Sequence, residues 1–231
     1  MARAITAPRL AALAASLIAG HAMAGTVLFS DNFQNTSLKS QWSSNSLINT
    51  DASSTLTYFS GRYSGNTAVT LTLNGAPTPP LGAGDAGGGG KYNLYTLTFD
   101  FYCIDSWDGN DPVNGPDRFS ILANSTTIFS ETFGNVYGPQ TMRAPDVGPV
   151  NMVFNSAYPD SIYRKITVDF RVPDSVAFTL RFGAAGLQGL NDESWGIDNV
   201  SVSYNVVPAP GAAAAAFAGG GLALLRRRRS L

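Results

Sequence analysis

The segment that most constrains the fold is Tyr92–Asp105, in which polar and apolar side chains alternate. The residues of one parity are all apolar: Tyr95, Leu97, Phe99, Phe101 and Cys103. Successive side chains of a β-strand point to opposite faces of its sheet. The pattern therefore predicts a long strand with one face in a hydrophobic core. No stretch between Gly25 and Tyr204 shows a sustained helical period.

Shorter segments of the same kind accompany this strand. Strands are predicted at Thr26–Ser30, Thr67–Leu73, Arg118–Ala123, Thr126–Phe133, Met152–Phe154, Ile162–Val172, Val176–Phe182 and from Trp195 to Val202 or Tyr204. Asn124–Ser125 is predicted as a turn, and Pro173–Asp174 as a hairpin connection. Nine or ten short strands joined by Gly, Pro, Asn and Asp predict an all-β fold, a single jelly-roll-type antiparallel β-sandwich.

The first 24 residues have the three parts of a secretory signal peptide. Arg3 and Arg9 supply the positive start, and Leu10–Gly20 is an apolar core too short to cross a bilayer. Ala22-Met23-Ala24 is a small-x-small site, so cleavage is expected after Ala24. The sequence is therefore divided into three parts: a signal peptide at 1–24, a β-sandwich domain at 25–205 and a C-terminal signal at 206–231.

The C-terminal signal joins a proline motif, an apolar run and a cationic end. The proline motif contains Pro208, Pro210 and Gly211, and the cationic end consists of Arg226, Arg227, Arg228 and Arg229. Residues 211–225 would form a helix about 22 Å long, shorter than the roughly 30 Å hydrocarbon core of a bilayer. The arginines favour the cytoplasmic side. The run is therefore predicted to form a short transmembrane sorting helix, which contacts the membrane transiently or permanently.

This order of parts resembles the PEP-CTERM sorting signal of Gram-negative bacteria. Ala209 stands where that family usually has Glu, so the tail looks like a Val-Pro-x-Pro-Gly variant. The resemblance implies export by the Sec machinery and cleavage near the prolines by an exosortase, a membrane cysteine transpeptidase. It also implies a place in the cell envelope, on the outer surface or in the extracellular matrix, linked to exopolysaccharide and biofilm formation. A plain uncleaved membrane anchor is the alternative.

The charge of the chain is unevenly divided between its parts. The full sequence has a net charge of −1, but residues 25–205 hold nine basic and 16 acidic residues, a net charge of −7. Such a body is not expected to bind nucleic acid. Its only cysteine is Cys103, expected as a buried inert thiol, so no disulfide within the chain is expected.

Catalysis has little support in the composition of the body. The one histidine, His21, lies in the signal peptide, which removes Ser–His, Cys–His and most zinc chemistry from the mature chain. The body has two glutamates, Glu131 and Glu193, and no pair of aspartates is singled out as a glycosidase pair. The protein is therefore predicted not to be an enzyme, with an Asp-based glycosidase as the remaining alternative.

The two ends of the body carry a first candidate metal site. Trp195–Val202 resembles the closing strand of jelly-roll modules of the concanavalin-like, MAM and carbohydrate-binding kind, and Asp31-Asn32-Phe33 with Trp42 resembles their opening. In several such modules paired carboxylates hold a structural calcium. The resemblance implies calcium at Asp31 and Asp198. The alternative is that Asp198 and Asn199 make turn or edge hydrogen bonds.

The loop from Asp105 to Asp117 is a second candidate. Its six side-chain oxygen donors are Asp105, Asp108, Asn110, Asp111, Asn114 and Asp117. Calcium prefers oxygen ligands, although the loop lacks the order of an EF-hand. Trp107 lies in the same loop and is considered as a surface for stacking on a sugar ring. The alternatives are ordinary turn chemistry and an indole that covers the edge of the core.

The sequence thus favours an exported, non-enzymatic protein with a structural or adhesive role. A carbohydrate-binding module is the second interpretation, with the Asp105–Asp117 loop or a face of the sandwich as its site. A polysaccharide-active enzyme is the third.

Overall fold

The computed structural model describes residues 25–35, 37–49, 56–76, 92–152, 154–173 and 176–205. The predicted signal peptide and the predicted sorting signal lie outside these ranges. The described residues form eleven strands and no helix. Consequently, this part of the chain contains no helix with the length and apolarity of a membrane span.

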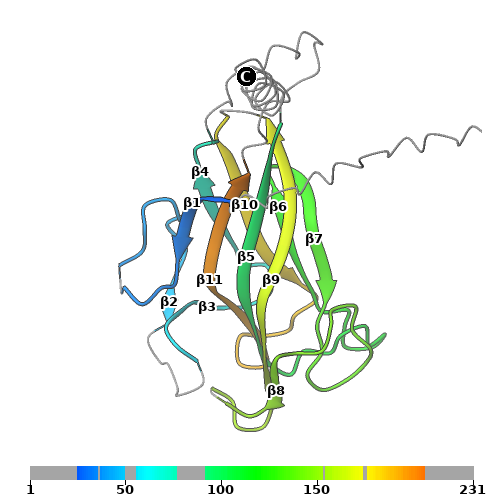
Figure 1. The fold of residues 1–231 in the computed structure, drawn as a ribbon. Coiled ribbons are helices and arrows are strands. Elements are labelled where there is room, and N and C mark those ends of the chain that lie inside the picture. Colours follow the sequence, from blue (N-terminus) through cyan, green and yellow to red (C-terminus); the bar gives the residue numbers. More distant parts are fainter. Residues whose placement is uncertain are drawn as a thin grey trace, which may run out of the picture.

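The strands form two antiparallel sheets (Figure 1). The seven-stranded sheet has the order β2 (Ile48–Asn49), β3 (Phe59–Tyr63), β11 (Glu193–Asn205), β5 (Tyr92–Asp105), β9 (Asp160–Pro173) and β8 (Val147–Val150), and β1 (Thr26–Asp31) also pairs with β11. The four-stranded sheet has the order β4 (Ala68–Leu73), β10 (Phe178–Ala185), β6 (Arg118–Ala123) and β7 (Thr126–Thr132).

The hydrophobic core lies between the two sheets. The apolar face predicted for Tyr92–Asp105 is confirmed, because the side chains of Tyr95, Leu97, Phe99, Phe101 and Cys103 are fully buried. The ring centroid of Phe99 on β5 is 6.2 Å from those of Phe119 on β6 and Phe182 on β10. Apolar faces from both sheets therefore form one core, which confirms the all-β antiparallel sandwich.

Two predicted elements are wrong. Met152 is not in a strand, and Val147–Val150 forms β8 instead. The Pro173–Asp174 hairpin is also absent, because β9 pairs with β5 and β8 whereas β10 pairs with β4 and β6. The chain changes sheets between β9 and β10. Alternation along each strand shows which side chains are buried but does not show which strand is the neighbour.

A second, smaller apolar cluster covers part of the outer face of the seven-stranded sheet. It contains Leu56, Phe59, Tyr102, Ile104 and Ile162. Two of these side chains come from the parity of β5 opposite to the main core. The cluster thus fixes the segment before β3 against the outside of the sheet.

Candidate metal centre

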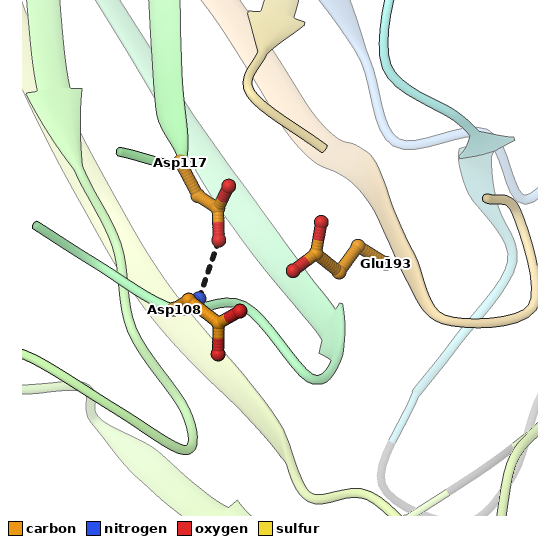
Figure 2. A group of neighbouring side chains, drawn as sticks. All are labelled: Asp108, Asp117 and Glu193. Atoms are coloured by element: carbon orange, nitrogen blue, oxygen red, sulfur yellow. Dashed lines mark hydrogen bonds between the residues drawn. The ribbon is translucent and has the colours of Figure 1, made fainter. Parts of the chain in front are cut away.

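Three acidic side chains gather at one end of the sandwich (Figure 2). Asp108 and Asp117 come from the loop between β5 and β6, and Glu193 is the first residue of β11. One carboxylate oxygen from each lies within 4.8 Å of the others, and all three residues are buried. In the described ranges no other cluster of three His, Cys, Asp or Glu residues meets this criterion.

We call Asp108, Asp117 and Glu193 the acidic trio. The pairing of β11 with β5 brings Glu193 to the two aspartates of the loop. Glu193 faces Asp105 across the β11–β5 pairing, so β11 begins where the loop leaves β5. The loop then folds back on itself. The Asp108 backbone N–H donates to Asp117 Oδ2, and the Asp117 backbone N–H donates to the Gly109 carbonyl at 2.8 Å. The Gln188 backbone N–H donates to Glu193 Oε2 at 2.7 Å and holds the third carboxylate in place.

Each member of the trio keeps one buried oxygen unsatisfied. Asp108 Oδ1, Asp117 Oδ1 and Glu193 Oε1 have no hydrogen-bond partner among the described residues. The two ion pairs of the described structure are Arg62–Asp105 and Arg143–Asp146, and neither includes a member of the trio. Burying a carboxylate without a partner is costly, so this arrangement calls for a proton or a cation.

The protonation equilibria of the trio reflect this cost. Burial, with a further contribution from the charge of Asp117, raises the pKa of Glu193 to about 8. Burial also raises the pKa of Asp117 to about 6, and the charge of Asp108 adds to the effect. The pKa of Asp108 is raised by burial and by the charges of Asp111 and Asp192. Protons therefore bind the metal-free trio more tightly than they bind free carboxylates.

The donor set fits a hard divalent cation. All three side chains offer oxygen, and no histidine or cysteine belongs to the group. Calcium accepts six to eight oxygen ligands in irregular geometry, whereas zinc favours nitrogen and sulfur. Gly186 lets its backbone lie close to the trio, since a Cβ built there would lie 3.0 Å from Asp117 Oδ1 and 2.2 Å from the Pro116 carbonyl oxygen. The residues present thus fit calcium better than zinc.

The structure uses the other acids of this loop differently. Asp105 Oδ2 forms an ion pair with Arg62 Nη2 at 2.5 Å. Asp111 Oδ1 accepts the backbone N–H groups of Val113 and Asn114 at 2.9 and 2.8 Å, a local turn interaction. Of the four aspartates predicted in the loop, the trio contains Asp108 and Asp117.

Sequence reasoning missed Glu193 as a member of the acidic group. Its only signal was its position two residues before Trp195, at the start of a predicted strand. That signal acquires meaning only when the register of β11 against β5 is known.

The predicted pair Asp31 and Asp198 is occupied by protein donors. Asp31 accepts the Phe33 backbone N–H at 3.1 Å and the Trp42 indole N–H at 3.0 Å. Asp198 Oδ2 accepts the hydroxyls of Thr57 and Tyr102 at 2.9 and 3.0 Å. Asp198 Oδ1 also accepts the Asn199 backbone N–H at 2.7 Å, a local contact of the kind considered as the alternative. The bonds from Thr57 and Tyr102, in contrast, join segments far apart in the sequence.

Trp107 lies inside the core. Its side chain is fully buried, and its ring centroid is 5.6 Å from that of Phe101 and 6.0 Å from that of Phe133. Its indole N–H donates to the Ser194 carbonyl at 2.7 Å. A buried indole has no face free for a sugar ring, so the sugar contact considered for Trp107 finds no support. The side chain instead attaches the loop to β11 next to Glu193.

No family model and no curated protein matches this chain. Among solved structures, it is similar to the xylan-binding CBM22-1 domain of Paenibacillus barcinonensis Xyn10C, with 10% identity over 79% of this chain and 97% of that one, at a TM-score of 0.42. Latent PorU from Porphyromonas gingivalis matches with 17% identity over 63% of this chain, at a TM-score of 0.38, and the chain spans 10% of PorU. An exo-β-1,3-galactanase from Phanerochaete chrysosporium matches with 14% identity over 78% of this chain and 30% of that one, at a TM-score of 0.29. Likeness at this level says nothing about what the chain binds.

Proposed function

We propose that this protein is an exported, non-enzymatic component of the bacterial envelope or extracellular matrix, and that a structural calcium ion holds its β-sandwich together. The observation that carries the proposal is the acidic trio: Asp108, Asp117 and Glu193 are buried together, and each has an oxygen that no described residue hydrogen-bonds. A cation there would join the β5–β6 loop to the start of β11.

The burial of the trio favours a structural role over a catalytic one. Asp117 and Glu193 are fully buried and Asp108 is 5% exposed, which leaves a substrate no access to their oxygens. Extracellular calcium modules commonly bind with dissociation constants of about 10⁻⁴–10⁻³ M. An exported domain with such a site would gain its full stability only after leaving the cell.

The sequence supports a location outside the cytoplasm for this structural role. The predicted signal peptide and the tail that resembles a PEP-CTERM signal favour export and processing by an exosortase. An acidic body without histidine fits a structural or adhesive partner of exopolysaccharide in a biofilm better than an enzyme. A carbohydrate-binding module remains the second candidate, favoured by a hollow on the larger sheet that polar and charged residue types line.

Thermal unfolding of the purified chain, with calcium and with excess chelator, tests the calcium site. Calcium at about 100 times its dissociation constant stabilises a native state by about 2.7 kcal/mol. For a domain of this size, that corresponds to a rise of about 5–10 °C in the unfolding midpoint. Magnesium at the same concentration should give a smaller rise, because it loses its water ligands reluctantly. Equal midpoints with calcium and with chelator would refute the site.

A further inference from the structure

A hollow of about 600 Å³, lined by polar and charged residue types, lies over the middle of the seven-stranded sheet, on the face turned away from the main core. Its floor is formed by Thr98, Asp100 and Tyr102, three alternate residues of β5. The neighbouring strands of β5 are β11 and β9 (Figure 1). They contribute Asn199 on one side and the adjacent Arg164 and Lys165 on the other, and Thr57 adds to the rim. None of these residues belongs to the acidic trio.

Two irregularities of the sheet build this hollow. The register shifts between Phe99 and Phe101 where β5 pairs with β9, and between Asp198 and Ser201 where β11 pairs with β5. Lys165 and Asn199 have positive φ angles of 53° and 49°. β-Bulges of this kind re-aim side chains and are over-represented beside functional sites. Here two of them flank the same residue of the central strand, Asp100.

Asp100 is used entirely in holding the bulges. Its Oδ1 accepts the Lys165 backbone N–H at 2.7 Å, and its Oδ2 accepts the Asn199 side-chain N–H at 2.9 Å. The adjacent Asp198 similarly accepts the hydroxyls of Thr57 and Tyr102. The acidic groups at this site therefore serve the protein itself and are not left over for a ligand.

The basic groups of the hollow have no such partners. The side chains of Arg164 and Lys165 are exposed, and neither forms an ion pair within the described ranges. Asp146 accepts the Arg164 backbone N–H, but its own ion pair is with Arg143. Residues 25–205 contain only nine basic residues against 16 acidic ones. The pKa of Asp146 is lowered by its hydrogen bond from Arg143 and, to a lesser extent, by the charge of Arg164. Asp100 also lies in the hollow, but neither basic side chain forms an ion pair among the described residues. Two exposed cations on the rim of a hollow can attract an anionic ligand.

The other lining groups narrow the class of ligand. Tyr102 is 4% exposed, so its ring offers no platform of the kind on which a neutral sugar stacks. The Thr57 hydroxyl and the Asn199 side-chain N–H already donate to Asp198 and Asp100. The oxygens of Thr57, Thr98 and Asn199 can still accept hydrogen bonds from a ligand rich in hydroxyl groups. The volume falls in the usual range of about 300–1,000 Å³ for small-ligand sites. We propose that this hollow binds an acidic saccharide, with the carboxylate of a hexuronate unit facing Arg164 and Lys165.

Titration calorimetry of the full-length chain in detergent provides the test. The probes are trigalacturonic acid, its uncharged methyl ester and neutral galactotriose, all short enough to avoid cation-bridged aggregation. The acid should bind at least tenfold more tightly than either neutral probe. Its affinity should fall as salt rises from about 0.05 to 0.5 M, because mobile ions screen exposed charges. Failure of the acid to bind, or equal affinities for acid and ester, would overturn the proposal.

Matched variants locate the binding. Replacing both rim cations, Arg164→Gln with Lys165→Gln, should weaken trigalacturonate binding at least tenfold while the unfolding midpoint stays near that of the parent. The control is Arg181→Gln, which removes one charge from an exposed arginine in a separate hollow on the four-stranded sheet and should change affinity less than twofold. Undiminished binding by the double variant would exclude this hollow. Displacement of the saccharide by equimolar acetate or sulfate would show a simple anion site and would also overturn the proposal.

Discussion

Glu193 shows how a single buried charge determines the chemistry of the trio. It is fully buried, its Oε1 has no partner among the described residues, and its pKa of about 8 lies above those of Asp105, Asp117 and Asp198, each about 6. In the unfolded chain the same group has an ordinary pKa near 4.5. The sequence could place Asp108 and Asp117 in one oxygen-rich loop. It could not add Glu193, because only the pairing of β11 with β5 brings that residue to the loop.

The change Glu193→Gln should separate proton binding from calcium binding. As pH rises from about 4.5 through 8, unfolded chains release the Glu193 proton before folded ones do, so the metal-free native state loses stability. Glutamine cannot ionise, so the variant's metal-free unfolding midpoint should fall less between pH 5 and pH 8. Its calcium affinity should be at least tenfold lower, because one of three anionic ligands is gone.

Melts at pH 5 and pH 8, with calcium and with chelator, measure both effects. In the parent, the stabilisation by calcium should grow with pH, because the cation then competes with fewer bound protons. Glu131→Gln changes the other glutamate of the body, on β7 and outside the trio, and should leave the calcium response intact. If Glu193→Gln bound calcium as tightly as the parent does, Glu193 would not be a ligand.

At the scale of the strands, the alternation of apolar residues predicted where β5 lies and which face it buries, but it did not predict which strands pair. The bounds of β5 and its buried face follow directly from the sequence, because a strand with one apolar face must turn that face inward. The bulges around Asp100 were not predicted, since each depends on a neighbouring strand that comes from a distant part of the sequence. The same limit explains the wrong hairpin after β9. β2 escaped prediction because its two residues are too few to show an alternation, although Ile48 packs against the core.

Gly186 lies where the end of β10 meets the loop that carries Asp117, and it offers a test at this scale. Its φ angle is +99°, and a Cβ there would come within 2.2 Å of the Pro116 carbonyl oxygen. Gly186→Ala should therefore shift Pro116 and Asp117, lower the unfolding free energy by about 1–3 kcal/mol and weaken calcium binding. Calorimetry and chemical denaturation measure the two effects.

The matched control is Gly189→Ala, three residues further along the chain. A Cβ at Gly189 would have no heavy atom within 4 Å. This variant should change the unfolding free energy by less than about 0.5 kcal/mol, as surface substitutions usually do, and should bind calcium normally. If Gly186→Ala behaved in the same way as Gly189→Ala, the loop would be free to adjust, and the position of Asp117 would not depend on this contact.

On the scale of the whole molecule, charge separates the body from its ends. The full chain is nearly neutral because Arg3, Arg9 and the four terminal arginines offset the acidic body. Loss of both ends would leave an acidic sandwich with a net charge of −7, a buried acidic trio at one end and a hollow on one face whose rim carries Arg164 and Lys165. Calcium would then neutralise the buried carboxylates of the trio, and the exposed Arg164 and Lys165 would attract an acidic saccharide to the hollow. Processing of the ends would thus determine the surface that the protein presents.

Mass spectrometry of the protein from cells that contain an exosortase tests that processing. The expected mature chain begins at Gly25 and ends near Pro210, because the predicted cleavage sites flank the body on both sides. Replacing Pro208 and Pro210 with alanine should leave the tail attached, whereas replacing Pro173 inside the body should not alter processing. Changing the four terminal arginines to glutamine should also impair it, since they favour the cytoplasmic side of the membrane. A parent protein recovered intact to Leu231 in the membrane fraction would instead support a plain anchor and contradict sorting.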